Sequence, residues 1–186
     1  MISAGLVELE KLGFVEIRPR QGAFVSDYRR RGTVETLVAI MRYNGGAMRR
    51  NEVKSLLETR GALEELCVRL AVENAADAEL EALQPILDRL ENAPDPEAAA
   101  EAVFTFHHEL AVLSGNVLLP LLYHSFKPES QYLWALSARQ QGVRQLWELK
   151  RALYQALLNR DAASAVRQTR AVMDAALANP SLWGQG

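Results

Sequence analysis

The sequence predicts an all-α protein, in which an antiparallel helical bundle follows a small unit of one helix and one β-hairpin. Three observations support this fold class. After residue 33, apolar residues recur at intervals of three and four, which is the period of amphipathic helices. Between residues 14 and 25, the period changes to that of two short strands. The 186 residues are 49% apolar, enough for one main domain with an appendage.

Composition narrows the class of protein. The net charge of −2 gives no overall sign of a nucleic-acid partner. No window approaches the roughly 18 uninterrupted apolar residues of a membrane span, and no signal segment follows Met1. We therefore expect a cytoplasmic protein without a membrane partner. Cys67 is the single cysteine and lies on an apolar stripe, which excludes a disulfide framework and a cysteine-ligated zinc site.

The first 25 residues predict a helix and a hairpin. The helix runs to Lys11 and ends at Gly13, because apolar residues recur in it at helical spacing. These are Ile2, Leu6, Leu9 and Leu12. Two strands, 14–17 and 23–25, flank the turn RPRQG.

The stretch LEKLGFVEIRPRQGAFVSD resembles the end of the winged helix-turn-helix of GntR-type transcription regulators, the recognition helix followed by the wing. The resemblance implies operator DNA as a partner, with Arg18 and Arg20 at phosphates or in the minor groove. The implied DNA-binding positions are Ser3, Arg18, Arg20 and Gly22. An alternative is that these arginines form only a solvated basic turn and tether, continued by Arg29, Arg30 and Arg31.

A winged helix needs two helices before its recognition helix, and in the sequence as given Met1 falls where the recognition helix should already have begun. We therefore expect the chain as written to bind operator weakly or not at all. A truncated dimerisation partner that does not bind DNA is an alternative. The expected domains are a partial winged helix over 1–25, a linker over 26–33 and a helical effector-binding and dimerisation domain over 34–186.

The helical domain is expected to contain a series of helices separated by Gly, Pro and Asx signals. Gly45 and Gly46 should break the chain after the first helix, and Pro85 should kink the third. Gly115 should end the central helix, and Asn116 can cap the next. The expected helical segments are 34–42, 51–73, 78–90, 97–114, 117–126, 128–141, 143–159 and 161–178.

Three of the apolar stripes contain an ionisable residue: Arg60, His107 and Lys150. Burying an unpaired charge costs several kcal/mol, so each needs a partner. The partner could be internal, since Arg60 and Glu64 lie four apart and Lys150 could extend to the bundle end. Alternatively, the three line a cavity for a carboxylate, phosphate or thioester ligand. In that case Trp147, Tyr154 and Phe106 offer apolar walls.

The helical domain resembles the effector domain of the FadR branch of GntR regulators, through LLETRGALEELCVRLA, FHHELAVLSGN and the Arg160–Asp161 junction. Many relatives hold a divalent metal through an aspartate four residues before the histidine, and two histidines eleven residues to either side of the acidic junction. Here those places carry Val103, Lys150 and Val172, and only His107 matches. We therefore expect no metal and no cofactor.

The resemblance then favours the metal-free, acyl-CoA-responsive FadR type. It implies ligand-gated DNA binding by a homodimer, with acyl-CoA or another organic acid as the effector, and no enzyme activity. A metal-dependent organic-acid sensor of the same family is the alternative. The expected effector-binding residues are Arg60, His107, Asn116, Trp147, Lys150 and Tyr154.

Overall fold

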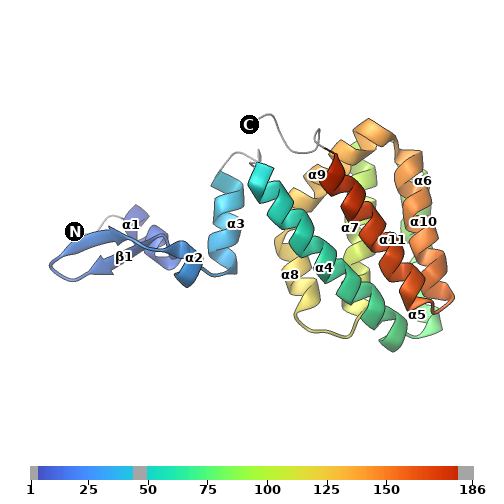
Figure 1. Ribbon diagram of the computed structural model, residues 1–186, viewed down its shortest axis with the longest axis horizontal. Coiled ribbons are helices and arrows are strands. Elements are labelled where there is room, and N and C mark those ends of the chain that lie inside the picture. Colours follow the sequence, from blue (N-terminus) through green and yellow to red (C-terminus); the bar gives the residue numbers. More distant parts are fainter. Residues whose placement is uncertain (1–3, 44–49, 180–186) are drawn as a thin grey trace. The chain divides into compact units, whose positions relative to one another are not determined.

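The computed structural model describes residues 4–43 and 50–179. These residues form eleven helices and one two-stranded antiparallel sheet, so the predicted all-α class with a hairpin is confirmed (Figure 1). By internal packing the chain divides into two compact units, Met1–Met48 and Arg49–Gly186.

The first unit contains the predicted helix and hairpin. Its strands pair in the register Val15↔Val25 to Arg18↔Gly22. Arg20 and Gly22 have positive φ values of 63° and 112°, so the turn between the strands uses left-handed backbone. The elements are α1 (Ala4–Lys11), β1 (Val15–Arg18), β2 (Gly22–Val25), α2 (Tyr28–Arg31) and α3 (Val34–Tyr43).

Residues 26–33, expected to be a linker, instead contain α2 and pack against the hairpin. The rings of Tyr28 and Phe14 lie 6.0 Å apart. The hydroxyl of Thr36, on α3, donates to the carbonyl of Leu12 at 2.6 Å. Helix α3, expected within the effector domain, therefore belongs with the first unit. The predicted break at residues 45–46 and the candidate Ser3 lie outside the described residues.

The second unit is a bundle in which α7 packs against α4, α6, α8 and α9, while α11 packs against α4 and α10 (Figure 1). Its elements are α4 (Arg50–Asn74), α5 (Asp77–Glu81), α6 (Gln84–Glu91), α7 (Pro96–Leu113), α8 (Leu119–Ser125), α9 (Lys127–Gln141), α10 (Val143–Leu158) and α11 (Ala162–Ala178). None of the described helices is long and apolar enough to cross a membrane.

Most helix ends follow the local signals in the sequence. The Asp161 carboxylate accepts from the Ser164 amide at 2.9 Å and caps α11, as predicted. Gly115 adopts φ +72° after α7. The kink predicted at Pro85 is wrong: α5 and α6 are separate helices, and Pro85 lies in the first turn of α6, where its missing N–H leaves no helical bond unmade.

One end of the bundle is a purely apolar cluster, formed by the second half of α4, α5, α6, the second half of α10 and parts of α7 and α11. We call it the apolar end. Its buried members are Val68, Ala71, Ala75, Leu80, Leu83, Ile86, Leu87, Phe106, Leu110, Leu153, Tyr154, Ala156, Leu157 and Ala165.

Near the middle of α4, Gly61 permits a close approach to α11. A Cβ at Gly61 would lie 3.0 Å from Cγ of Met173. A side chain there would therefore push Met173 or α11 away.

Candidate functional site

The three ionisable residues of the stripes meet inside the bundle. Arg60 (α4), His107 (α7) and Lys150 (α10) are 4%, 2% and 2% exposed. Together with three further buried side chains they form what we call the polar cluster. Its members are Arg60, Glu64, His107, Tyr123, Trp134 and Lys150.

Glu64 is the acidic centre of the polar cluster. Its Oε1 lies 2.9 Å from Nε of Arg60 and accepts a hydrogen bond of 2.9 Å from the hydroxyl of Tyr123. Its Oε2 lies 3.7 Å from Nδ1 of His107. Burial alone would raise the pKa of Glu64, but the neighbouring His107, Arg60 and Lys150 together hold it below its usual value. Glu64 is therefore ionised at neutral pH.

Both cations of the cluster, Arg60 and Lys150, lie over the ring of Trp134 on α9. Cζ of Arg60 lies 4.6 Å from the ring centroid, and Nζ of Lys150 lies 4.3 Å from it. These are cation–π distances. Lys150 has no ion pair with any described residue. Burial lowers its pKa to about 8, and the charge of Arg60 adds to this, while Glu64 opposes it.

His107 points inward, as its position on the stripe predicted. Its ring stacks between Tyr123, at 6.1 Å, and Trp134, at 6.0 Å. Burial lowers its pKa to about 3, so the imidazole is neutral at pH 7. With Glu64 ionised and Arg60 and Lys150 protonated, the polar cluster carries a net charge of +1.

A cavity of about 160 Å³ adjoins the polar cluster on the side of α9 and α11. Arg60 and Trp134 belong to its wall, and both have buried nitrogens without a hydrogen-bond partner among the described residues, Nη1 and Nε1. The wall consists of Leu57, Arg60, Leu133, Trp134, Ser137, Gln141, Gln145, Leu146, Leu149, Ala171, Val172, Ala175 and Ala176.

Of the six predicted effector residues, only Arg60 belongs to the wall of this cavity. His107 and Lys150 lie beside it in the polar cluster, and the other three lie elsewhere. Trp147 packs under the guanidinium groups of Arg144 and Arg151, at 4.2 and 5.1 Å. Tyr154 belongs to the apolar end, where its hydroxyl donates to the Glu81 carbonyl at 3.3 Å. The amide oxygen of Asn116 accepts from the backbone N–H of Leu118 at 2.9 Å. The N-cap of α8 is Leu118 and not Asn116, so the predicted capping role of Asn116 is wrong.

Sequence reasoning did not assign Tyr123 and Trp134 to the site. Tyr123 lies in an almost wholly apolar segment, where nothing distinguishes it from a core residue. For Trp134 a signal was present, because Ser137 and Gln141 follow it at helical spacing and all three line the cavity. A polar and aromatic stripe of this kind on α9 indicates a wall rather than a core face.

The places that bind metal in many relatives do not fit a metal here. Val103 is completely buried and offers no donor atom, and Val172 is part of the cavity wall. Lys150 places an ammonium group where a ligand would be needed. Within residues 4–43 and 50–179, no three His, Cys, Asp or Glu side chains come together as metal ligands would.

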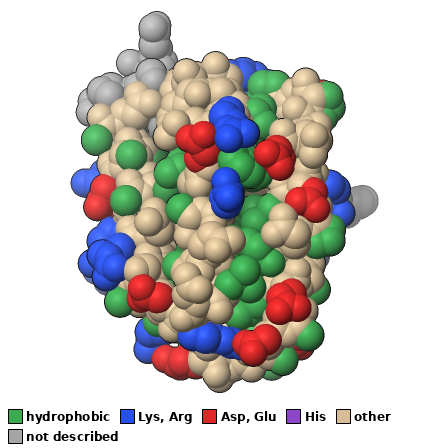
Figure 2. All heavy atoms as spheres, turned by 90° about the vertical axis from the view of Figure 1, so that its right-hand side faces the viewer, with side chains coloured by type: hydrophobic (Ala, Val, Ile, Leu, Met, Phe, Trp, Pro, Cys, Tyr) green, Lys and Arg blue, Asp and Glu red, His purple; other side chains and the backbone are tan. Residues whose placement is uncertain are grey.

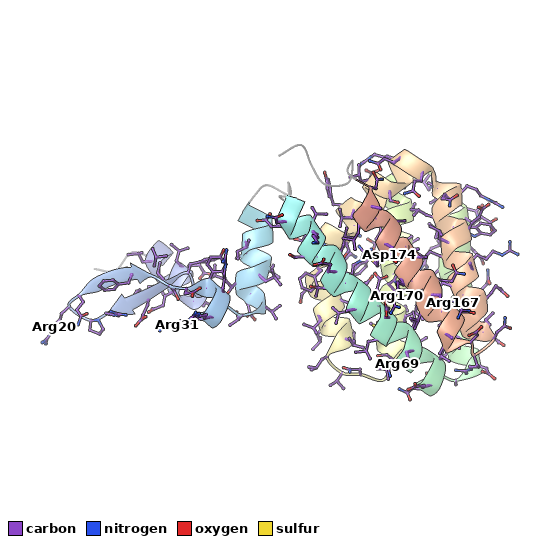
Figure 3. The ribbon with its side chains drawn as sticks, in the orientation of Figure 1. Arg20, Arg31, Arg69, Arg167, Arg170 and Asp174 are labelled. Carbon is purple, nitrogen blue, oxygen red and sulfur yellow. The ribbon has the colours of Figure 1, made fainter. Side chains whose placement is uncertain are left out.

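In the first unit, the predicted DNA-binding residues differ in their partners. Arg18 pairs with Glu16 at 3.1 Å and covers the ring of Phe24. Arg31 pairs with the same carboxylate at 2.6 Å. Arg20 projects from the tip of the hairpin and has no partner among the described residues (Figure 3). On the bundle face of Figure 2, by contrast, basic and acidic side chains are interspersed.

Residues 55–175 match the family model of the FCD domain. The chain is 29% identical over 186 residues to the HTH-type transcriptional regulator LutR of Bacillus subtilis (strain 168), with 96% of this chain and 80% of LutR covered.

Two solved structures are also similar. Streptococcus agalactiae GntR has a TM-score of 0.60 at 18% identity, covering 92% of this chain and 78% of that one. E. coli McbR/YncC has a TM-score of 0.59 at 20% identity, covering 100% and 88%. At these identities the structural likeness concerns the fold.

Proposed function

Because this chain belongs to the GntR family of transcription regulators and carries an FCD domain, we propose that a small organic anion, bound in the cavity beside Arg60, controls its binding to operator DNA. The observation that carries the proposal is the unbalanced positive charge of the polar cluster next to a cavity.

The Arg60 guanidinium is the anchor that we assign to the anion. Its Nε lies close to Glu64, and its Nη2 donates to the sulfur of Met173 at 3.8 Å. Its buried Nη1 has no partner among the described residues. An unsatisfied donor on a buried charge is costly, and a carboxylate in the cavity would remove that cost. The indole N–H of Trp134 offers a second donor in the same wall.

The size of the cavity favours a short acid over acyl-CoA. At about 160 Å³ it is smaller than the roughly 300–1,000 Å³ of pockets that hold drug-sized ligands. The amides of Gln141 and Gln145 and the hydroxyl of Ser137 suit a hydroxyl or oxo group on such an acid. The acyl-CoA effector suggested by the sequence resemblance would need a much larger space.

The DNA-binding part of the proposal rests on the hairpin. Arg20, exposed at the tip, is free to meet a phosphate, whereas Arg18 and Arg31 share the carboxylate of Glu16. We propose that two chains, as a homodimer, place two such hairpins on operator DNA. Helix α4 carries Arg60 and Glu64 and is the first helix after the first unit, so a ligand that shifts α4 acts on the segment leading to DNA.

The test is a melting-temperature panel with short mono- and dicarboxylates, a neutral sugar and acyl-CoA. An anion at a hundredfold excess over its Kd should add about 2.7 kcal/mol to the free energy of unfolding. Lys150→Met should abolish or strongly reduce that gain, while the matched change Lys54→Met on the exposed face of α4 should leave it intact. A panel in which no carboxylate shifts the transition would overturn the proposal.

A further inference from the structure

Helices α7 and α8 meet through two successive pairs of side chains, one inside and one outside. The inner pair is His107 and Tyr123 of the polar cluster. The next residue on each helix forms the outer pair, His108 and His124, whose ring centroids lie 5.6 Å apart. His124 is exposed and His108 partly so. Neither imidazole makes a hydrogen bond or ion pair with another described residue, so their nitrogens are free to bind a ligand.

We propose that His108 and His124 form a binding site for a late first-row transition ion, Zn²⁺, Ni²⁺ or Cu²⁺, with water completing its coordination. Imidazole is a preferred ligand of these ions, whereas Mg²⁺ and Ca²⁺ prefer oxygen. Two imidazoles that share a tetrahedral ion, at about 2.0–2.1 Å per nitrogen, have ring centres on the order of 5 Å apart. The observed separation of 5.6 Å is close to this value.

The surroundings hold the two rings in place. The buried ring of Phe104 stacks on His108 at 5.8 Å and meets His124 edge-on at 6.3 Å. A cation also contacts Phe104: Nζ of Lys127 lies 5.1 Å from the Phe104 centroid and pairs with Glu101 at 2.8 Å. The charge of Lys127 opposes an incoming metal ion, so it should weaken the site without blocking it.

This site is separate from the bundle interior where many relatives bind a metal. Two protein ligands make a weaker and more exchangeable site than three or four, so dialysis should empty it. The ion would nevertheless tie α8 to α7. Because Tyr123 on α8 donates to Glu64, fixing these helices would act on the polar cluster from outside.

The experiment is a calorimetric titration of the untagged full-length chain with ZnCl₂, with MgCl₂ as the negative control. We expect one Zn²⁺ per chain. His108→Ala and His124→Ala should each weaken binding by about tenfold or more, since even outer-shell losses cost that much. Lys127→Met should tighten binding a few-fold, because it removes the opposing charge while keeping the aliphatic stem.

Imidazole ¹⁵N NMR provides a second, residue-specific readout. The chain has three histidines. The assigned signals of His108 and His124 should shift when Zn²⁺ is added, while the signal of buried His107 should not shift. Two results would overturn the proposal: no Zn²⁺ binding by the folded wild-type chain, or binding of unchanged affinity in both alanine variants. Because neither measurement uses DNA or an organic anion, the outcome is independent of the proposed function.

Discussion

The polar cluster and the apolar end share helices α4, α7 and α10 but differ in what they leave unsatisfied. On α10, Lys150 belongs to the first, and Leu153, one turn later, to the second. On α7, His107 belongs to the polar cluster, and its neighbour Phe106 belongs to the apolar end. In the apolar end, the buried side chains are almost all hydrocarbon and need no further partner. In the polar cluster, similar burial leaves Lys150 without an ion pair and Nη1 of Arg60 without a hydrogen bond among the described residues. The comparison teaches that burial alone does not identify a structural core.

The largest effect is expected from truncation at the apolar end. Leu157 is fully buried there, so Leu157→Ala should lower the free energy of unfolding by about 2–5 kcal/mol through lost burial and a cavity. Chemical denaturation measures this. Affinity for the anion should not change in the folded protein, and a parallel loss of affinity would show that the two regions are not independent.

Lys150→Met should act in the opposite direction. The pKa of Lys150 is about 8 in the folded protein, against 10.5 as its ordinary value, which corresponds to about 3 kcal/mol of disfavoured charge. At pH 7 the variant should therefore be as stable as the wild type or more so, by at most that amount.

The same residue predicts an alkaline pH dependence. Between pH 8 and 10.5 the unfolded lysine keeps a proton that the folded one has lost, so the wild-type free energy of unfolding should rise with pH. That rise should be absent from Lys150→Met. A variant with lower stability at pH 7 and the same slope would mean that Lys150 is an ordinary structural residue.

His107 predicts an effect on the acid side. Its pKa of about 3 lies below the ordinary 6.5, so between these values the unfolded chain binds a proton that the folded one does not. Stability should fall as pH decreases through this window, by about 2 kcal/mol at pH 5. The glutamine of His107→Gln does not titrate. The difference in the free energy of unfolding between the wild type and this variant should therefore shrink from pH 7 to pH 5, as chemical denaturation at both pH values would show.

The smallest effect is expected from Tyr154→Phe. It removes a 3.3 Å hydrogen bond to the Glu81 carbonyl at the apolar end, so stability should fall by about 0.5–1.5 kcal/mol. Anion affinity should stay the same. A marked loss of affinity would return Tyr154 to the effector site, where sequence reasoning placed it.

The sequence predicted the features that depend on one helix at a time. The inward direction of His107 follows from the spacing of its own stripe, and the cap at Asp161 from three residues of local chain. The meeting of Tyr123, Trp134 and Lys150 depends on how α8, α9 and α10 pack, which no single period encodes. For the same reason Trp147 and Tyr154 were expected at the cavity. Trp147 lies on the stretch of α10 that reaches the cavity but belongs to another face of the helix, and Tyr154 lies more than one turn beyond Leu149, the last α10 residue of the wall.

The helix α2 within residues 26–33, which the sequence did not predict, has a similar origin. Three consecutive arginines after Tyr28 resemble a solvated tether when only their charge is considered. Their helix is held by contacts across the hairpin, with Phe14 under Tyr28 and Glu16 beside Arg31. Such contacts bring together residues about fifteen positions apart, and the pattern of neighbouring residues does not predict them.

Gly61 allows α4 and α11 to pack closely. Its missing side chain lets α11 come so close that a single added carbon would lie 3.0 Å from Met173. Arg60, the preceding residue on α4, and the residues Ala171, Val172, Ala175 and Ala176 of α11 belong to the cavity wall. We therefore expect any larger residue at position 61 to act as a spacer between these two helices and to change the volume of the cavity.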